Sequence, residues 1–179
     1  MNELIARVKG MILAPAAEWR AIQREPIELV PVFTRYVMVL AAIPAIASML
    51  LLMAFGLFFA AISTAIVSYV LSLVAVVVTA KIVEILAPKF GGPTDPDAAL
   101  KLAAFAPTVA WVAGGAIIVP ILGSLVALVG ALYSLYILYL GVPIVMRVPQ
   151  EKALTFTLAV IGVAIVVQLA VRLLTGIFI

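Results

Sequence analysis

Long runs without a charged residue dominate this sequence and alternate with short charged segments. Two runs, residues 36–80 and 102–146, are 45 residues long each, and a third, residues 153–171, has 19. A helix needs roughly 20 apolar residues to cross a hydrocarbon core of ~30 Å. The first two runs are therefore long enough for two crossings each, and the third for one. The pattern predicts an all-α integral membrane bundle of five transmembrane helices.

Prolines, glycines and charges suggest where these helices begin and end. We expect five spans, at residues 32–52, 57–85, 100–119, 124–146 and 153–174. Turns near Gly56 and between Pro120 and Ser124 would join four of them into hairpins. In the one long polar loop, Asp95 before Pro96 predicts a helix N-cap.

Residues 1–30 precede this transmembrane domain, which covers residues 31–179, and form a charged leader. Leu4, Val8 and Met11 recur at helical spacing on one face. The leader is therefore predicted to be a short amphipathic segment that lies in the membrane interface. A flexible polar leader is the alternative, and no secretory signal peptide is expected because an apolar h-region is missing.

The charges are segregated to one side of the predicted membrane. Five crossings place all 8 acidic residues and ten of the 11 basic residues on the side of the leader. The positive-inside rule then predicts a cytoplasmic N-terminus and an external C-terminus in the cell inner membrane. The sequence pI of about 9.4 is explained by this bias, so nucleic acid is not expected as a partner.

Three residues are expected to anchor the protein at the membrane surfaces. Trp19 beside Arg20 suits the headgroup level, where an aromatic ring and a cation both find partners. Arg172, the one basic residue on the other side, lies about 20 residues after Lys152, or roughly 30 Å along a helix. Anchoring at the external interface is the favoured role of Arg172, and a substrate site is the alternative.

Composition narrows the chemistry that the chain can perform. Hydrophobic residues make up 67% and charged residues 11%, which a water-soluble core of this size could not accommodate. Cysteine and histidine are both absent, which removes thiolate nucleophiles, cysteine metal sites and the commonest general base. We expect no catalytic site, no cofactor and no metal site.

Hydroxyl groups inside the predicted spans are candidates for an interior polar cluster. They form a stripe on the second span and a row of phenols on the fourth: Thr64, Ser68, Ser72, Tyr133, Tyr136 and Tyr139. Because a buried phenol needs a hydrogen-bond partner, Tyr133 and Tyr136 are predicted to point into the bundle, with Ser68 and Ser72 as acceptors. Helix packing and a binding cavity are both compatible with this pattern.

Lys81 and Glu84 are spaced i, i+3 near the charged end of the second span. Residues at this spacing share a helix face and can form an ion pair. We predict a structural pair, since a lysine at that depth can extend its ammonium group to water.

Several stretches resemble bacterial members of the Yip (Ypt/Rab-interacting protein) family. They are the leader MILAPAAEWRAIQREP, the loop at Gly91-Gly92 followed by ALKLAAFAPTV, and YSLYILYLG in the fourth span. The resemblance implies five spans and a cytoplasmic N-terminus. Eukaryotic relatives work in vesicle trafficking and contact Rab GTPases, whereas this leader of about 30 residues offers little surface for a GTPase.

Two functions are compatible with the sequence. The leading hypothesis is a non-enzymatic, Yip-like membrane protein that organises membranes or acts in a trafficking-like role through lipid or protein contacts at its cytoplasmic face. The alternative is a transporter or channel for a small solute or ion, with a path lined by Ser, Thr and Tyr residues. Membrane lipids are the expected partners, and rows of small residues leave a membrane-protein partner or a homo-oligomer open.

Overall fold

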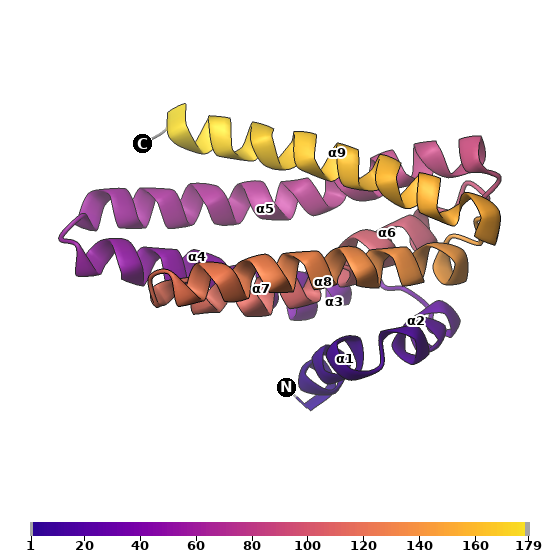
Figure 1. Ribbon diagram of the computed structural model, residues 1–179, viewed down its shortest axis with the longest axis horizontal. Coiled ribbons are helices and arrows are strands. Elements are labelled where there is room, and N and C mark those ends of the chain that lie inside the picture. Colours follow the sequence, from indigo (N-terminus) through magenta and orange to yellow (C-terminus); the bar gives the residue numbers. More distant parts are fainter. Residues whose placement is uncertain (1, 178–179) are drawn as a thin grey trace.

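The chain folds into five long antiparallel helical spans with a pair of short helices beside them (Figure 1). The structure is a computed structural model that describes the backbone of residues 2–177 and the side chains of these residues except 171, 172 and 174–177. The helices long and apolar enough to cross a membrane are Leu29–Ala54, Phe58–Phe90, Pro96–Ile118, Leu122–Val145 and Gln150–Ala170. The predicted all-α bundle of five spans is confirmed.

The first span is made of three helical pieces that follow one another without a loop. They are α3 (Leu29–Val32), a π-helical turn η1 (Phe33–Val37) and α4 (Met38–Ala54). A turn at Gly56, where φ is +78°, joins α4 to the second span. A glycine suits this position because the left-handed region costs it nothing. The second span is α5 (Phe58–Leu86), continued by η2 (Ala87–Phe90).

The third span is broken at Pro107. It consists of α6 (Pro96–Phe105), α7 (Thr108–Gly114) and η3 (Gly115–Ile118). The Asp95 side chain accepts a hydrogen bond from the backbone N–H of Ala98 at 2.9 Å, which is the predicted N-cap. At the break, the backbone N–H of Ala110 lacks a helical partner and donates to the Ser134 hydroxyl at 2.9 Å.

The fourth and fifth spans are α8 (Leu122–Val145) and α9 (Gln150–Ile177). Glycines bring α8 close to the third span, since a Cβ at Gly130 would collide with Ala113 and one at Gly123 with the backbone of Ala116. Small residues therefore allow the close packing of this hairpin. Gly114, however, faces Pro44 of α4 and not α8.

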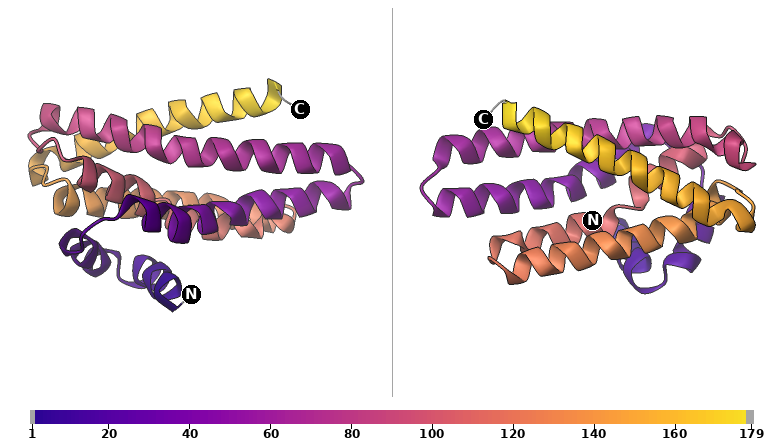
Figure 2. Two further views of the ribbon diagram at one scale, coloured as in Figure 1. Left: turned by 180° about the vertical axis from the view of Figure 1, so that it is seen from behind. Right: turned by 45° about the horizontal axis from the view of Figure 1, so that its top comes forward.

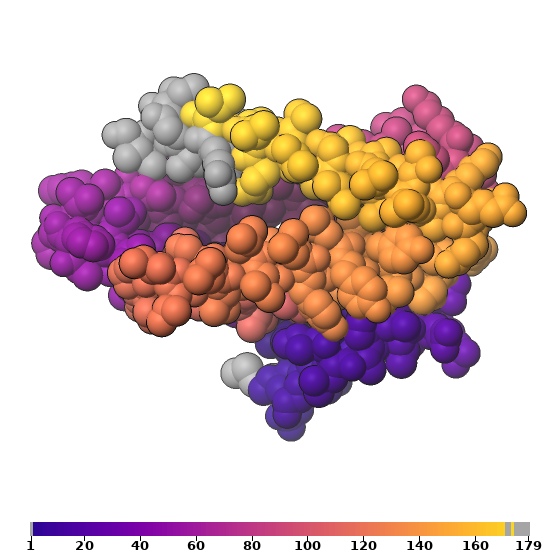
Figure 3. All heavy atoms as spheres, in the orientation of Figure 1, coloured from indigo at the N-terminus to yellow at the C-terminus, as the bar shows by residue number. Residues whose placement is uncertain are grey.

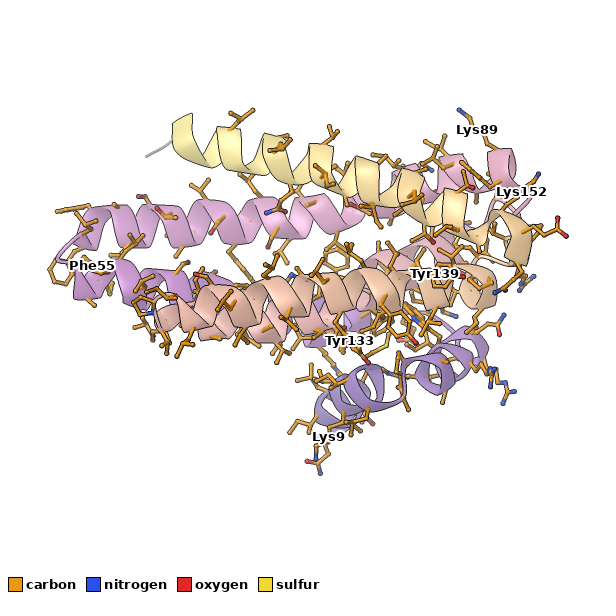
Figure 4. The ribbon with its side chains drawn as sticks, in the orientation of Figure 1. Lys9, Phe55, Lys89, Tyr133, Tyr139 and Lys152 are labelled. Atoms are coloured by element: carbon orange, nitrogen blue, oxygen red, sulfur yellow. The ribbon has the colours of Figure 1, made fainter. Side chains whose placement is uncertain are left out.

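The leader consists of α1 (Asn2–Leu13) and α2 (Pro15–Arg24) and lies along the flank of the bundle, under α6 and α8 (Figures 1 and 2). Lys89 and Lys152 lie together at one end of the bundle, which we call the charged end, and Phe55 lies at the opposite end (Figure 4). Lys9 lies beside the bundle, between these two levels.

Candidate functional site

Trp19 fastens the leader to α8. Its side chain has no exposed surface, and its indole N–H donates to the carbonyl of Ile137 at 2.9 Å. The ring fits against Gly141, where an added Cβ would lie 2.6 Å from a ring carbon. Trp19 is therefore not the interface anchor that the sequence suggested. Its ring packs against α8 and not against lipid. The sequence could not distinguish the two environments, because both are apolar.

The C-terminal end of α2 is held by two further side chains. Lys101, buried in α6, donates from Nζ to the carbonyls of Glu25 at 2.6 Å and Gln23 at 3.3 Å. The last carbonyls of a helix have no partner within it and attract a cation. The Gln23 amide in turn donates to the carbonyl of Ile144 at 2.5 Å. The sequence did not reveal that Lys101 binds the leader, because a charged residue beside the polar loop is expected to face water.

The hydroxyl of Tyr133 points toward the leader and not into the bundle interior. Its hydroxyl donates to the carbonyl of Ile12 at the end of α1, at 2.8 Å. Half of the Tyr136 side chain is exposed on the outer surface, and Tyr139 is partly buried against the core. The prediction that Tyr133 and Tyr136 point into the bundle is therefore wrong. The buried phenol did need a partner, but the leader supplies it.

Arg7 connects the two leader helices. Its guanidinium contacts the carboxylates of Glu18 at 2.6 Å and Glu25 at 2.5 Å. It also lies over the Phe105 ring, 5.8 Å from the centroid. Burial by itself would lower the pKa of Arg7, but the hydrogen bonds and charges of Glu25 and Glu18 outweigh it and raise the pKa. Arg7 thus remains a cation, and its position is defined from three directions.

A groove separates α1 from the start of the first span. Its volume is about 910 Å³, and it is lined by four ionic residues together with threonine, aromatic and apolar side chains. Arg7 and Glu25 of this lining are paired with one another, whereas Arg35 and Glu3 have no ion-pair partner among the described residues. The leader therefore forms one wall of a polar groove beside the bundle. We call it the leader groove.

The hydroxyl stripe of α5 does not meet the tyrosine row. Ser68 and Ser72 donate to carbonyls of their own helix, those of Ala65 at 3.3 Å and Tyr69 at 2.7 Å. Thr64 is partly buried on the same helix. Seryl hydroxyls in a helix have such local acceptors within reach, so they did not require the phenols. The six predicted residues do not form one interior cluster.

A smaller cavity of about 200 Å³ lies among α5, α6, α7, α8 and α9. Figure 3 shows the surface hollowed between α8 and α9, with α5 behind. Most of its lining is apolar, and its polar side chains are Ser72, Thr79, Ser134 and Gln168. None of the three predicted tyrosines lines it. The tyrosine row therefore does not line this cavity, which is where the described residues come nearest to a path.

The remaining predicted residues lie near the ends of the bundle. Lys81 Nζ lies 2.9 Å from both carboxylate oxygens of Glu84, so the two side chains pair as their spacing suggested. Arg20 is exposed on the outer side of α2. The side chain of Arg172 lies outside the described residues.

Comparison with known proteins gives two findings. A model of the Yip1 domain matches residues 9–171. Two relatives, both named inner membrane protein YohC, come from Escherichia coli strain K12 and from E. coli O6:H1 strain CFT073. Each is 25% identical over 178 residues, covering 91% of this chain and 90% of the relative. No solved structure matches the chain.

Proposed function

This chain belongs to the Yip1 domain family, and from that membership we propose a non-enzymatic protein that acts through lipid and protein contacts at a cytoplasmic face. It is a multi-pass membrane protein, and the name of its E. coli relatives supports a location in the bacterial inner membrane. The role that fits is membrane organisation or a trafficking-like function. The observation that carries the proposal is the cationic outer side of the docked leader.

The outer side of the leader carries three exposed cations, Lys9, Arg20 and Arg24. None of them has an ion-pair partner among the described residues. A basic residue near an anionic leaflet contributes about 1 kcal/mol of attraction. Because Trp19 and Lys101 hold the leader in place, these cations form a fixed surface and not a mobile tail. A fixed cationic surface can gather anionic lipids or an acidic protein segment.

The distribution of the other charges supports a cytoplasmic location of this surface. Lys89, Arg147 and Lys152 are exposed, and Lys89 and Lys152 lie at the charged end (Figure 4). The short turns at the other end, near Gly56 and Pro120, carry no charge. Cytoplasmic loops are enriched in lysine and arginine. We therefore assign the charged end and the leader to the cytoplasm.

We infer from the position of Lys9 that the bundle is tilted in the membrane. An upright bundle would place Lys9 against hydrocarbon, because it lies between the levels of Phe55 and Lys89 (Figure 4). With 29 residues, α5 is ~43 Å long, against a hydrocarbon core of ~30 Å. Tilting accommodates such excess length. A tilt that lowers the leader flank toward the cytoplasm brings Lys9 and Lys89 to one interface.

The cavity beside α9 gives the transporter alternative little support. A solute path needs polar groups that are free to replace water. Ser72 already donates to its own helix, and Ser134 accepts from Ala110. Thr79 and Gln168 are the other polar side chains of the lining, and the rest of it is mostly apolar. The contact role therefore fits the residues better than transport.

The proposal is tested by the lipids that the full-length protein retains. We expect protein purified from a membrane of mixed phosphatidylglycerol and phosphatidylcholine to enrich the anionic lipid, measured by native mass spectrometry. Replacing Lys9, Arg20 and Arg24 together with Gln should reduce this enrichment by an order of magnitude or more, at about 1 kcal/mol for each charge. The matched variant Lys9→Arg/Arg20→Lys/Arg24→Lys should keep it. Equal enrichment in the Gln variant would overturn the proposal.

A further inference from the structure

We propose that the leader groove binds one phospholipid whose headgroup carries both a phosphate and a primary ammonium group, as phosphatidylethanolamine does. The inference rests on the proposed function only for the tilt that brings the leader to the interface. Its own support is the pairing of charges in the groove, the composition of the groove walls and the continuity of the groove with the lipid-facing side of α4.

The ionic residues of the groove leave one positive and one negative side chain for a ligand. Four ionic side chains line it, two arginines and two glutamates. Arg7 is already engaged by Glu25 and by Glu18, which lies outside the groove lining. Arg35 and Glu3 have no ion-pair partner among the described residues, although they line the same groove. The guanidinium fits a phosphate, and the carboxylate fits an ammonium group.

This arrangement distinguishes three common headgroups. An anionic headgroup without an amine would satisfy Arg35 but leave Glu3 without a counter-charge. A choline headgroup carries the positive charge but has no N–H to donate to a carboxylate. A primary ammonium provides both the charge and the hydrogen-bond donors. The groove should therefore prefer phosphatidylethanolamine to phosphatidylcholine and to phosphatidylglycerol.

The other walls of the groove suit the upper part of a lipid. They are apolar or aromatic, and include Leu4, Val32, Tyr36, Val39 and Phe105. Val39 also lies on the outer surface of the first span, where Ile46 and Leu50 are likewise exposed. An acyl chain can therefore leave the groove along α4 and enter the bilayer. The groove volume of about 910 Å³ is at the upper end of the range for small-molecule sites.

The experiment measures which lipids the full-length protein retains in each variant. The protein is placed in nanodiscs with equal amounts of phosphatidylethanolamine, phosphatidylcholine and phosphatidylglycerol, and the lipids that remain after mild detergent extraction are identified by native mass spectrometry. The wild-type protein should retain one phosphatidylethanolamine that depends on Arg35, in addition to the phosphatidylglycerol that Lys9, Arg20 and Arg24 enrich. Arg35→Gln should lower this retention about fivefold, as expected for the loss of one charge contact.

Glu3→Gln should act differently, because it removes only the contact with the ammonium group. Retention of the lipid should persist, but the preference for phosphatidylethanolamine over phosphatidylcholine should disappear. The matched controls are Arg147→Gln and Glu28→Gln, whose side chains are exposed and lie outside the groove. They should leave the phosphatidylethanolamine preference unchanged.

Three results would overturn the assignment: no headgroup preference in the wild-type protein, a preference for phosphatidylglycerol that follows Arg35, or an equal loss in the control variants. Failure here is separable from failure of the proposed function. If the outer cations of the leader still enrich anionic lipid while the groove shows no preference, only the groove assignment falls. If the anionic enrichment is absent and the groove preference remains, only the role of the outer cations falls.

Discussion

The two flanks of the bundle are held together in different ways. On the leader flank, side chains bind backbone carbonyls of distant elements: Trp19 binds that of Ile137, Lys101 that of Glu25, and Tyr133 that of Ile12. On the α9 flank, the hydroxyl of Thr157 donates to a carbonyl of its own helix, and a cavity lies between the second half of α9 and its neighbours. Directional contacts therefore specify where the leader docks, whereas apolar packing positions the described part of α9.

This difference has a physical reason. A spanning helix satisfies its own backbone groups, so it needs only a close fit to its neighbours. The leader is short and charged, and such helices are marginal without tertiary contacts. Each hydrogen bond to the bundle adds stability and also excludes other docking positions. Single substitutions of a hydrogen-bonding side chain, or of the glycine that makes room for Trp19, should therefore destabilise the docked leader. Comparable substitutions on the α9 flank should have little effect on stability.

Trp19→Ala should break the leader flank most strongly. It removes the one fully buried aromatic side chain of the leader and the bond to Ile137. Replacing a buried tryptophan by alanine costs about 3–5 kcal/mol. We expect the amides of α1 and α2 to lose protection from hydrogen exchange while the five spans keep theirs. Leu13→Ala, at a side chain that is 79% exposed in the same leader, is the control, and equal protection in both variants would contradict the docking model.

Two glycines allow a matched test of both flanks. A Cβ at Gly141 would lie 2.6 Å from the Trp19 ring, whereas one at Gly162 of α9 would meet nothing within 4 Å. Gly141→Ala should destabilise the docked leader by about 1–3 kcal/mol through overpacking. Gly162→Ala should leave the leader unchanged and should stabilise α9 by about 0.5–1 kcal/mol. The fluorescence of Trp19, measured in a Trp111→Phe background, reports whether the leader is displaced. A red shift in both variants would show that the close contact between Gly141 and Trp19 does not hold the leader.

Tyr133→Phe should have the smallest effect. It deletes only the hydroxyl that donates to Ile12, and a single hydrogen bond contributes about 1 kcal/mol. Exchange should therefore increase at the end of α1 and leave α2 unaffected. Tyr136→Phe is the control, because half of that side chain is exposed on the outer surface. Similar exchange in the two variants would show that the Tyr133 hydroxyl does not hold the leader.

Much of the fold followed from local patterns. The uncharged runs predicted five spans, Gly56 predicted the turn after the first of them, and Asp95 predicted a cap that the backbone of Ala98 satisfies. These features depend on residues close together in sequence. The candidate site depended on distant contacts, and there the predictions for Trp19 and for the tyrosine row were wrong. No local signal distinguishes an apolar face that meets lipid from one that meets protein.

The sequence by itself determined that the chain crosses a membrane five times, because charge cannot be left in hydrocarbon and helices need a minimum apolar length. Only the tertiary structure decided where the leader lies. Its apolar stripe would fit lipid or protein equally. It packs on the protein because Gly141 leaves room for Trp19, Lys101 binds the end of α2 and Tyr133 binds the end of α1. These three residues come together only when α6 and α8 pack. The docking of the leader also creates the leader groove, since its walls come from the leader, the start of the first span and Phe105 of α6.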